Sequence, residues 1–223
     1  MKLMYALWGT AIDATLRAPE LREALRAAGA TRLQVNVDDA DVAAAKLRIT
    51  TFDTPVCAVA SVWTEGGPAR FSGLLAGIAE RSAGWEVEER TPLVPPPTAD
   101  GQRCPALAQI GFLRIPPDLT AGEWLRRWQG LHTSVAIQTQ ATFGYVQNRV
   151  LRAVHGSDRV DALVEELFPM AAMTDLHAFY GSGGDDAELR RRLTLLIESV
   201  TRFGAHESLD ALPTSRYVYE LAS

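Results

Sequence analysis

A stretch near the middle of the chain, DLTAGEWLRRWQGLH (118–132), places two tryptophans and a histidine at intervals of four residues. Trp124, Trp128 and His132 would therefore lie along one face of a helix. An imidazole titrates near neutral pH, so His132 could move a proton on a bound molecule beside an apolar wall of indole rings. The alternative is that the tryptophans are core residues and that His132 stabilises the end of the helix.

A polar strand follows this helix. FGYVQNRVLRA (143–153) alternates in polarity, which predicts a β-strand with two different faces. If both faces are covered, every polar group needs a hydrogen-bond partner or a ligand. Tyr145 and Asn148 could each orient a carbonyl or phenolic oxygen, but in an unbulged strand they cannot share a face. The two sets are Tyr145, Gln147 and Arg149 on one face, and Val146, Asn148 and Val150 on the other.

Two glutamates interrupt an apolar strand further on, VDALVEELF (160–168). Glu165 and Glu166 would point to opposite faces of this strand. Desolvation raises the pKa of a carboxyl group, which suits a general acid or base. The alternative is an ion pair with Arg149 or Arg114.

Composition excludes several classes of function. The chain has 223 residues, of which 47% are hydrophobic and 22% charged, as in ordinary globular proteins. A net charge of -5 without a basic stretch argues against nucleic-acid binding, and no apolar run is long enough to span a bilayer. The two cysteines are not in a CxxC pair, which argues against a zinc site or a disulfide framework. We therefore expect a cytoplasmic protein with no nucleic-acid or membrane partner.

Prolines divide the chain into two halves. The segment TPLVPPPTADGQRCP (91–105) contains five prolines and predicts an extended connector. The expected division is a first half over 1–94, a linker over 95–106 and a second half over 107–223.

Both halves show the same order of elements. The first predicts strands over 2–8, 31–37, 54–63 and 84–91, with helices over 19–29, 41–49 and 69–82. The second predicts strands over 108–115, 143–153, 160–168 and 214–222, with helices from Thr120, over 173–180 and over 186–203. Each half is therefore a βαββαβ unit of the ferredoxin-like type.

The strands are apolar on both faces, so the sheet face that lacks helices must be covered. The fold class we expect is α+β, with two ferredoxin-like βαββαβ halves packed sheet to sheet as a single-chain α+β barrel. Such a chain could be a monomer that imitates a dimer, or a homodimer.

The second half, over about 108–222, resembles the EthD family of the dimeric α+β barrel superfamily. The motif runs from a D-x-T-x-x-E-W helix start through W-x-x-x-H to a Y-V-Q-N strand, and D-A-x-x-E-x-x-F stands where the family usually has D-G-x-x-E-x-x-F. The matching residues are Asp118, Thr120, Glu123, Trp124, Trp128, His132, Tyr145, Val146, Gln147, Asn148, Asp161, Glu165 and Phe168. The resemblance implies small-molecule chemistry without a nucleotide, as in polyketide cyclases, cofactor-free monooxygenases, decarboxylases and isomerases.

These observations together predict a small-molecule enzyme that transfers protons on an apolar aromatic or polyketide-like substrate without a cofactor or a metal. The reaction would be cyclisation, isomerisation or decarboxylation, and oxygenation without a metal is a further option. The alternative is a non-catalytic protein that binds haem or an apolar metabolite, with His132 or His177 as axial ligand. The predicted catalytic residues are His132, Tyr145 and Glu165. The predicted substrate-binding residues are Trp124, Trp128, Gln147, Asn148 and Arg149.

Overall fold

The computed structural model describes residues 1–221, and its eight strands close into one antiparallel barrel in the order β1-β3-β2-β8-β5-β7-β6-β4. The strands are β1 (Lys2–Trp8), β2 (Ala30–Val37), β3 (Ala58–Thr64), β4 (Arg81–Leu93), β5 (Leu107–Leu113), β6 (Gly144–His155), β7 (Ala162–Phe168) and β8 (Asp210–Glu220). The α-helices are α1 (Ile12–Leu16), α2 (Pro19–Ala27), α3 (Ala69–Ala76), α4 (Ala121–Leu125), α5 (Thr133–Thr139), α6 (Leu176–Tyr180) and α7 (Asp186–Arg202).

Each half contributes four strands in the same spatial order. The first half reads β4-β1-β3-β2 and the second β8-β5-β7-β6, which is the ferredoxin-like order of fourth, first, third and second strand. The halves join where β2 pairs with β8 and where β4 pairs with β6. The predicted fold class is confirmed.

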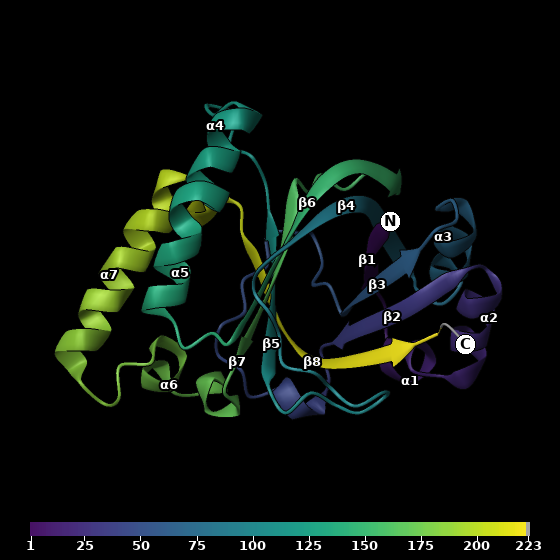
Figure 1. Cartoon of the computed structure of the whole chain (residues 1–223), viewed down its shortest axis with the longest axis horizontal. Helices are drawn as coiled ribbons and strands as arrows, with labels where there is room; N and C mark the ends of the chain where they lie inside the picture. Colours follow the sequence, from purple (N-terminus) through teal and green to yellow (C-terminus); the bar gives the residue numbers. More distant parts are fainter. Residues whose placement is uncertain (222–223) are drawn as a thin grey trace.

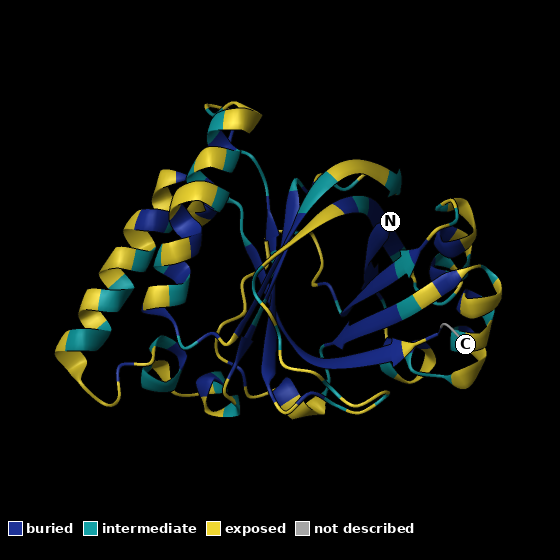
Figure 2. Ribbon diagram, viewed as in Figure 1, coloured by how far each residue is buried: buried dark blue, intermediate teal, exposed yellow. Residues whose placement is uncertain are grey.

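Helices cover the barrel on two opposite sides (Figure 1): α1 to α3 pack on the first half, and α4 to α7 on the second. Buried residues run along the barrel strands and alternate with exposed ones on the helices (Figure 2). The barrel interior is apolar at one end, where Met4, Trp8 and Phe112 belong to one buried cluster. Its other end is polar, with buried Lys2 and Glu165.

Several element boundaries differ from the sequence prediction. A helix over 41–49 is wrong: only a short 3-10 turn, η1 (Ala40–Val42), forms there. The following backbone bonds to other segments, since the Lys46 amide donates to Met173 and the Ile49 amide to Ala211. Elsewhere α3 ends at Ala76 and β4 already begins at Arg81, β3 begins only at Ala58, and a 3-10 turn, η3 (Met170–Met173), precedes α6. Residue 222 of the predicted last strand lies outside the described residues.

The helix that carries the W-x-x-x-H motif is divided into three segments. The Thr120 hydroxyl accepts a hydrogen bond from the Glu123 amide at 3.2 Å, so α4 begins directly after a capping residue, as the sequence indicated. A wider π-helical segment, η2 (Arg126–His132), then separates α4 from α5. Such segments are rare and often occur at functional sites.

Candidate functional site

A cavity of about 290 Å³ lies between the outer face of the second-half sheet and the helices that cover it. Its walls come from strands β5 to β8, from η2, α6 and α7, and from the loop before β3. The lining residues are Leu47, Ile49, Gln109, Gly111, Leu113, Trp128, His132, Gln140, Tyr145, Val164, Glu166, Phe179, Tyr180, Leu196, Ile197, Val200, Phe203, Ala205, His206, Leu209 and Ala211. The volume is at the lower end of the range of small-molecule sites.

Trp128 and His132 both line this cavity, as their spacing of four residues predicted. Trp128 is fully buried, and its ring packs against that of Trp124 at 4.8 Å between centroids. Trp124 lies behind Trp128 and is not part of the cavity wall. The first tryptophan of the motif is therefore a core residue, and the second is both core and cavity wall.

His132 lies at one side of the cavity, where it contacts two residues of the neighbouring helix and its end. Its Nδ1 lies 3.0 Å from the Ser199 hydroxyl, and its ring packs against Phe203 at 4.7 Å. Burial lowers the pKa of His132 to about 4. The expectation that His132 titrates near neutral pH is therefore wrong, because burial favours the neutral imidazole.

Three polar side chains form a row across adjacent strands on the cavity side of the sheet. In the register of the sheet, Gln109 on β5 lies directly opposite Glu166 on β7, and Glu166 lies directly opposite Tyr145 on β6. Gln109 Oε1 and Glu166 Oε1 are both buried and have no hydrogen-bond partner among residues 1–221. Two acceptor oxygens in this row therefore lack a donor.

Glu166 is the group in this row that titrates near neutral pH. Burial raises its pKa to about 7 from an ordinary value of 4.5. Burial also raises the pKa of Tyr145, and the negative charge of Glu166 raises it further. Near pH 7, Glu166 can therefore accept or donate a proton while Tyr145 stays protonated as a hydrogen-bond donor.

Gln147 connects the strand to the helix behind this row. Its Nε2 donates to the Tyr145 hydroxyl at 3.2 Å and to Thr133 Oγ1 at 2.9 Å. The Thr133 hydroxyl in turn donates to the Gln129 carbonyl in η2 at 2.9 Å. Gln147 is fully buried and outside the cavity wall, so it positions Tyr145 instead of contacting a ligand.

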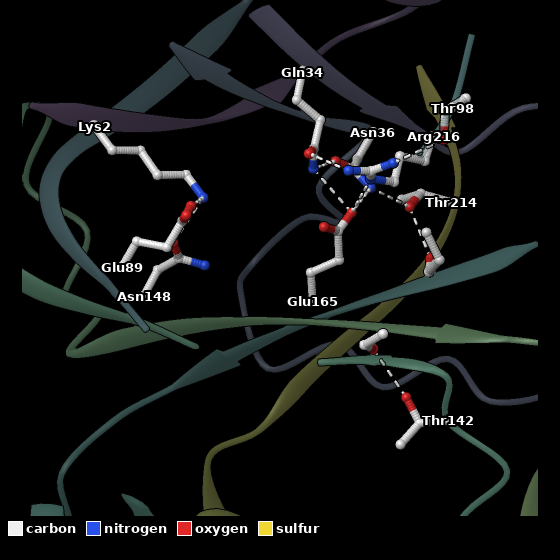
Figure 3. Close-up of polar contacts among 12 residues, drawn as sticks. Lys2, Gln34, Asn36, Glu89, Thr98, Thr142, Asn148, Glu165, Thr214 and Arg216 are labelled. Carbon is white, nitrogen blue, oxygen red and sulfur yellow. Dashed lines mark hydrogen bonds and ion pairs between the residues drawn. The ribbon is translucent and has the colours of Figure 1, made fainter. Parts of the chain in front are cut away.

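The remaining predicted site residues lie elsewhere. Glu165 and Asn148 point into the barrel, on the opposite side of the sheet from His132, and Figure 3 shows both among the interior polar contacts. Arg149 lies near the surface and pairs with Glu88 at 2.9 Å. The structure thus brings His132, Tyr145 and Trp128 together, and Glu166 takes the place expected for Glu165.

Glu165 does form an ion pair, but the expected partners are wrong. Arg216 lies 3.3 Å from it, whereas Arg149 pairs with Glu88 and Arg114 pairs with Asp210 at 2.7 Å. Arg216 is on β8, which follows β7 in sequence by more than forty residues, so local spacing gave no sign of this contact.

The rim of the cavity is apolar and open to solvent. Leu47, Ile49 and Ile197 are 40%, 39% and 54% exposed, although each lines the cavity. Large apolar side chains that are exposed around a cavity mouth are typical of sites for apolar ligands.

Within residues 1–221, no three His, Cys, Asp or Glu side chains lie close enough together to hold a metal ion. No helix in this part of the chain is long and apolar enough to cross a bilayer.

The fold resembles solved structures of very different sequence. No family model and no curated protein sequence matches this chain. An "anthrone oxidase-like protein" has 11% identity and a TM-score of 0.57, over 100% of this chain and 93% of that one. Similar structures include a "putative monooxygenase" from Lactobacillus acidophilus (10% identity, TM-score 0.49, 99% and 96% covered) and one from Fusobacterium nucleatum (9%, 0.48, 98% and 93%). The anthrone oxidase-like structure supports the barrel fold. At 11% sequence identity, however, a similar fold carries no information on activity.

Proposed function

We propose that this chain is an EthD-like small-molecule enzyme that transfers protons on an apolar aromatic or polyketide-like substrate bound in the 290 Å³ cavity. One observation carries the proposal: Glu166 has a buried oxygen without a hydrogen-bond partner, in a row of polar groups that faces this cavity. Burial at this position raises the pKa of Glu166 to about 7. A carboxylate with these properties matches the requirements of a general base.

The proposed reaction begins with removal of a proton from an acidic C–H or phenolic O–H of the substrate by Glu166. The resulting enolate or phenolate oxygen would accept a hydrogen bond from the Tyr145 hydroxyl. In the tautomer in which His132 Nδ1 accepts a hydrogen bond from the Ser199 hydroxyl, Nε2–H supplies a second donor. Return of the proton from Glu166 to a different carbon would complete an isomerisation. In a cyclisation the carbanion would attack a second carbonyl carbon, whose C=O π electrons pass to oxygen, and the proton held by Glu166 would then go to this alkoxide.

The expected substrate follows from the wall of the cavity. Most lining residues are apolar, and the rim at Leu47, Ile49 and Ile197 extends this surface to solvent. The unpartnered oxygens of Gln109 and Glu166 favour a molecule that offers a hydroxyl donor. An enolised aromatic ketone combines an apolar body with such a donor.

Anthrone, a tricyclic ketone with an acidic C–H opposite its carbonyl, is a suitable probe. We expect the wild-type protein to accelerate exchange of this C–H for deuterium in D₂O, followed by NMR. Glu166→Gln should lower the rate at least about 100-fold, within the usual range for loss of a general base. Glu165→Gln is the matched control on the other side of the same strand. If Glu166→Gln exchanges anthrone at the wild-type rate, or if Glu165→Gln lowers the rate equally, Glu166 is not the base.

Oxygen uptake in the same assay separates proton transfer from oxygenation. Oxidation of anthrone by O₂ gives anthraquinone and water, so consumption of one O₂ per product would indicate an oxygenase. Exchange without oxygen consumption would indicate the proton-transfer chemistry proposed here.

Non-catalytic binding of an apolar metabolite is the second candidate, and it would use the same cavity. Anthrone binding without any exchange would support it. For haem, His177 is the poorer axial ligand, since its Nδ1 lies 2.7 Å from Ser182 Oγ and its Nε2 lies 3.3 Å from Asp186. A Soret shift on addition of hemin that is lost in His132→Ala would favour a haem protein.

A further inference from the structure

A second cavity, of about 350 Å³, lies at the polar end of the barrel interior, on the other side of the sheet from the proposed active site. Seven of the eight strands and the connector after β4 contribute to its wall. The lining residues are Lys2, Arg32, Gln34, Trp63, Glu89, Thr91, Val94, Pro95, Pro96, Pro97, Thr98, Val146, Glu165, Arg216, Val218 and Glu220. The mechanism proposed above uses none of them.

The cavity wall contains three buried charges. Lys2 is 7% exposed, and Glu165 and Arg216 are each 4% exposed. Among the contacts drawn in Figure 3, Lys2 lies with Glu89 and Asn148, and Glu165 lies with Arg216, Gln34 and Asn36. The buried part of the wall thus has two cations and one carboxylate.

Stability alone is a poor explanation for this cluster. Burial of ionic groups costs desolvation energy, and apolar packing of similar volume is often equally stable or more stable. Glu89, which neutralises Lys2 at 2.5 Å, is 34% exposed and lies at the edge of the cavity. The carboxylate of a ligand could therefore replace that of Glu89 beside Lys2, while Glu89 turns to solvent. The number of buried charge pairs would stay the same.

The donors of the wall are not exhausted. The Lys2 ammonium has three N–H groups, and it donates to Glu89 and to Asn148 Oδ1. Arg216 donates one terminal N–H to Thr98 Oγ1 and another to Gln34 Oε1. Beside these donors, Trp63, the proline segment 94–97, Val146 and Val218 form an apolar surface.

We propose that this cavity binds a small organic carboxylate with an apolar body. Its carboxylate pairs with Lys2 in the position that Glu89 occupies, and its body packs against Trp63 and the prolines of the connector. The site exists only when the barrel is closed, because β2 and β8 meet at one junction of the halves and β4 and β6 at the other. It is independent of the proposed chemistry at Glu166.

Benzoate is the probe, and calorimetric titration gives its affinity. Benzamide, which lacks the charge, and inorganic phosphate, which lacks the apolar body, are the comparison ligands. We expect benzoate to bind at least about tenfold more tightly than either comparison ligand. Benzamide would replace the charge-assisted hydrogen bond to Lys2 with a neutral one, and phosphate would bury no apolar surface.

Two substitutions test the position of the carboxylate in opposite directions. Lys2→Met should weaken benzoate binding at least about tenfold, whereas Glu89→Gln should strengthen it because the competing carboxylate is removed. Glu166→Gln, in the other cavity, is the control and should leave benzoate affinity unchanged. If Lys2→Met fails to fold, Glu89→Gln still decides the question.

The proposal is overturned if benzoate does not bind the wild type or Glu89→Gln at millimolar concentration. It is also overturned if benzamide or phosphate binds as well as benzoate, or if Glu89→Gln weakens binding. A change of benzoate affinity in Glu166→Gln, in either direction, would place the ligand in the first cavity and would equally refute the second site.

Discussion

Replacing Glu166 with glutamine should stabilise the folded protein above neutral pH and leave it nearly unchanged in acid. Burial raises the pKa of Glu166 from 4.5 to about 7, so the folded protein holds a proton that the unfolded chain has lost between these values. Wild-type stability therefore falls as the pH rises from 4.5 to 7. Glutamine resembles the protonated acid and does not ionise, so the variant lacks this loss.

The magnitude follows from the shift. The difference between 7 and 4.5 corresponds to about 3 kcal/mol of unfolding free energy, as an upper value for a side chain that faces a cavity. For a protein of this size, that is roughly 6–12 °C in melting temperature. The full gain is expected only above the folded-state pKa of Glu166.

His132 contributes a slope of the opposite sign. Burial lowers its pKa from 6.5 to about 4, so the unfolded chain binds a proton in this range that the folded protein does not. This group's contribution to stability is present above pH 6.5 and is lost as the pH falls towards 4. In the wild type the two slopes overlap and partly cancel. In Glu166→Gln the unfolding free energy should rise with pH, because only His132 contributes. In His132→Gln it should fall with pH, because only Glu166 contributes.

Urea unfolding of the wild type, both single variants and the double variant, measured at pH values from about 4 to 8, tests this expectation. All other titrating groups are common to the four proteins, so differences between them isolate the two sites. The reasoning is refuted if Glu166→Gln differs from the wild type by the same free energy in acid and in base. A carboxyl ¹³C titration of Glu166 close to its ordinary value would refute it independently.

Three further substitutions test the structure. Trp128→Ala should lower the unfolding free energy, measured with urea, by about 3–5 kcal/mol, because the ring is fully buried. A decrease of less than about 1 kcal/mol would mean that the ring is not a core residue. Arg114→Met should cost about 3 kcal/mol in the same assay, because it leaves the buried carboxylate of Asp210 without its ion-pair partner; an unchanged midpoint would contradict this. Gly111→Leu should place a side chain in the cavity and weaken anthrone binding about tenfold or more. The leucine would displace a part of anthrone of similar size, and the lost burial of that apolar surface is worth well over about 1.4 kcal/mol of binding free energy. Gly111→Ala is its control, because an added Cβ would meet Leu209 at an ordinary 3.6 Å, and equal affinities of the two variants would contradict the placement of the cavity.

Much of the architecture is determined by local pattern. Alternating polarity in 143–153 and the continuous apolar strands at 2–8 and 160–168 reflect a side-chain period of two residues that any strand must have. The Thr120 cap and the spacing of Trp128 and His132 are likewise local, so the sequence alone predicted a helix with these two residues on one face. The need to cover two apolar sheet faces then predicted the closed barrel.

Tertiary structure decided the chemistry of the site. The sequence shows that Glu165 and Glu166 lie on opposite faces of one strand, but it does not show which face meets the helices. That depends on how β7 joins β5 and β6 and on where η2 and α7 pack, and these contacts place Glu166 beside Tyr145 and Glu165 inside the barrel.

The pKa values of His132 and Glu166 were also beyond local pattern. Both shifts arise from burial, which is the summed effect of segments distant in sequence, such as Ser199 and Phe203 around His132. The error over 41–49 has the same origin, since the amides of Lys46 and Ile49 find carbonyl partners on Met173 and Ala211. Helical propensity acts within a few residues, whereas desolvation and long-range hydrogen bonds exist only after the chain has closed.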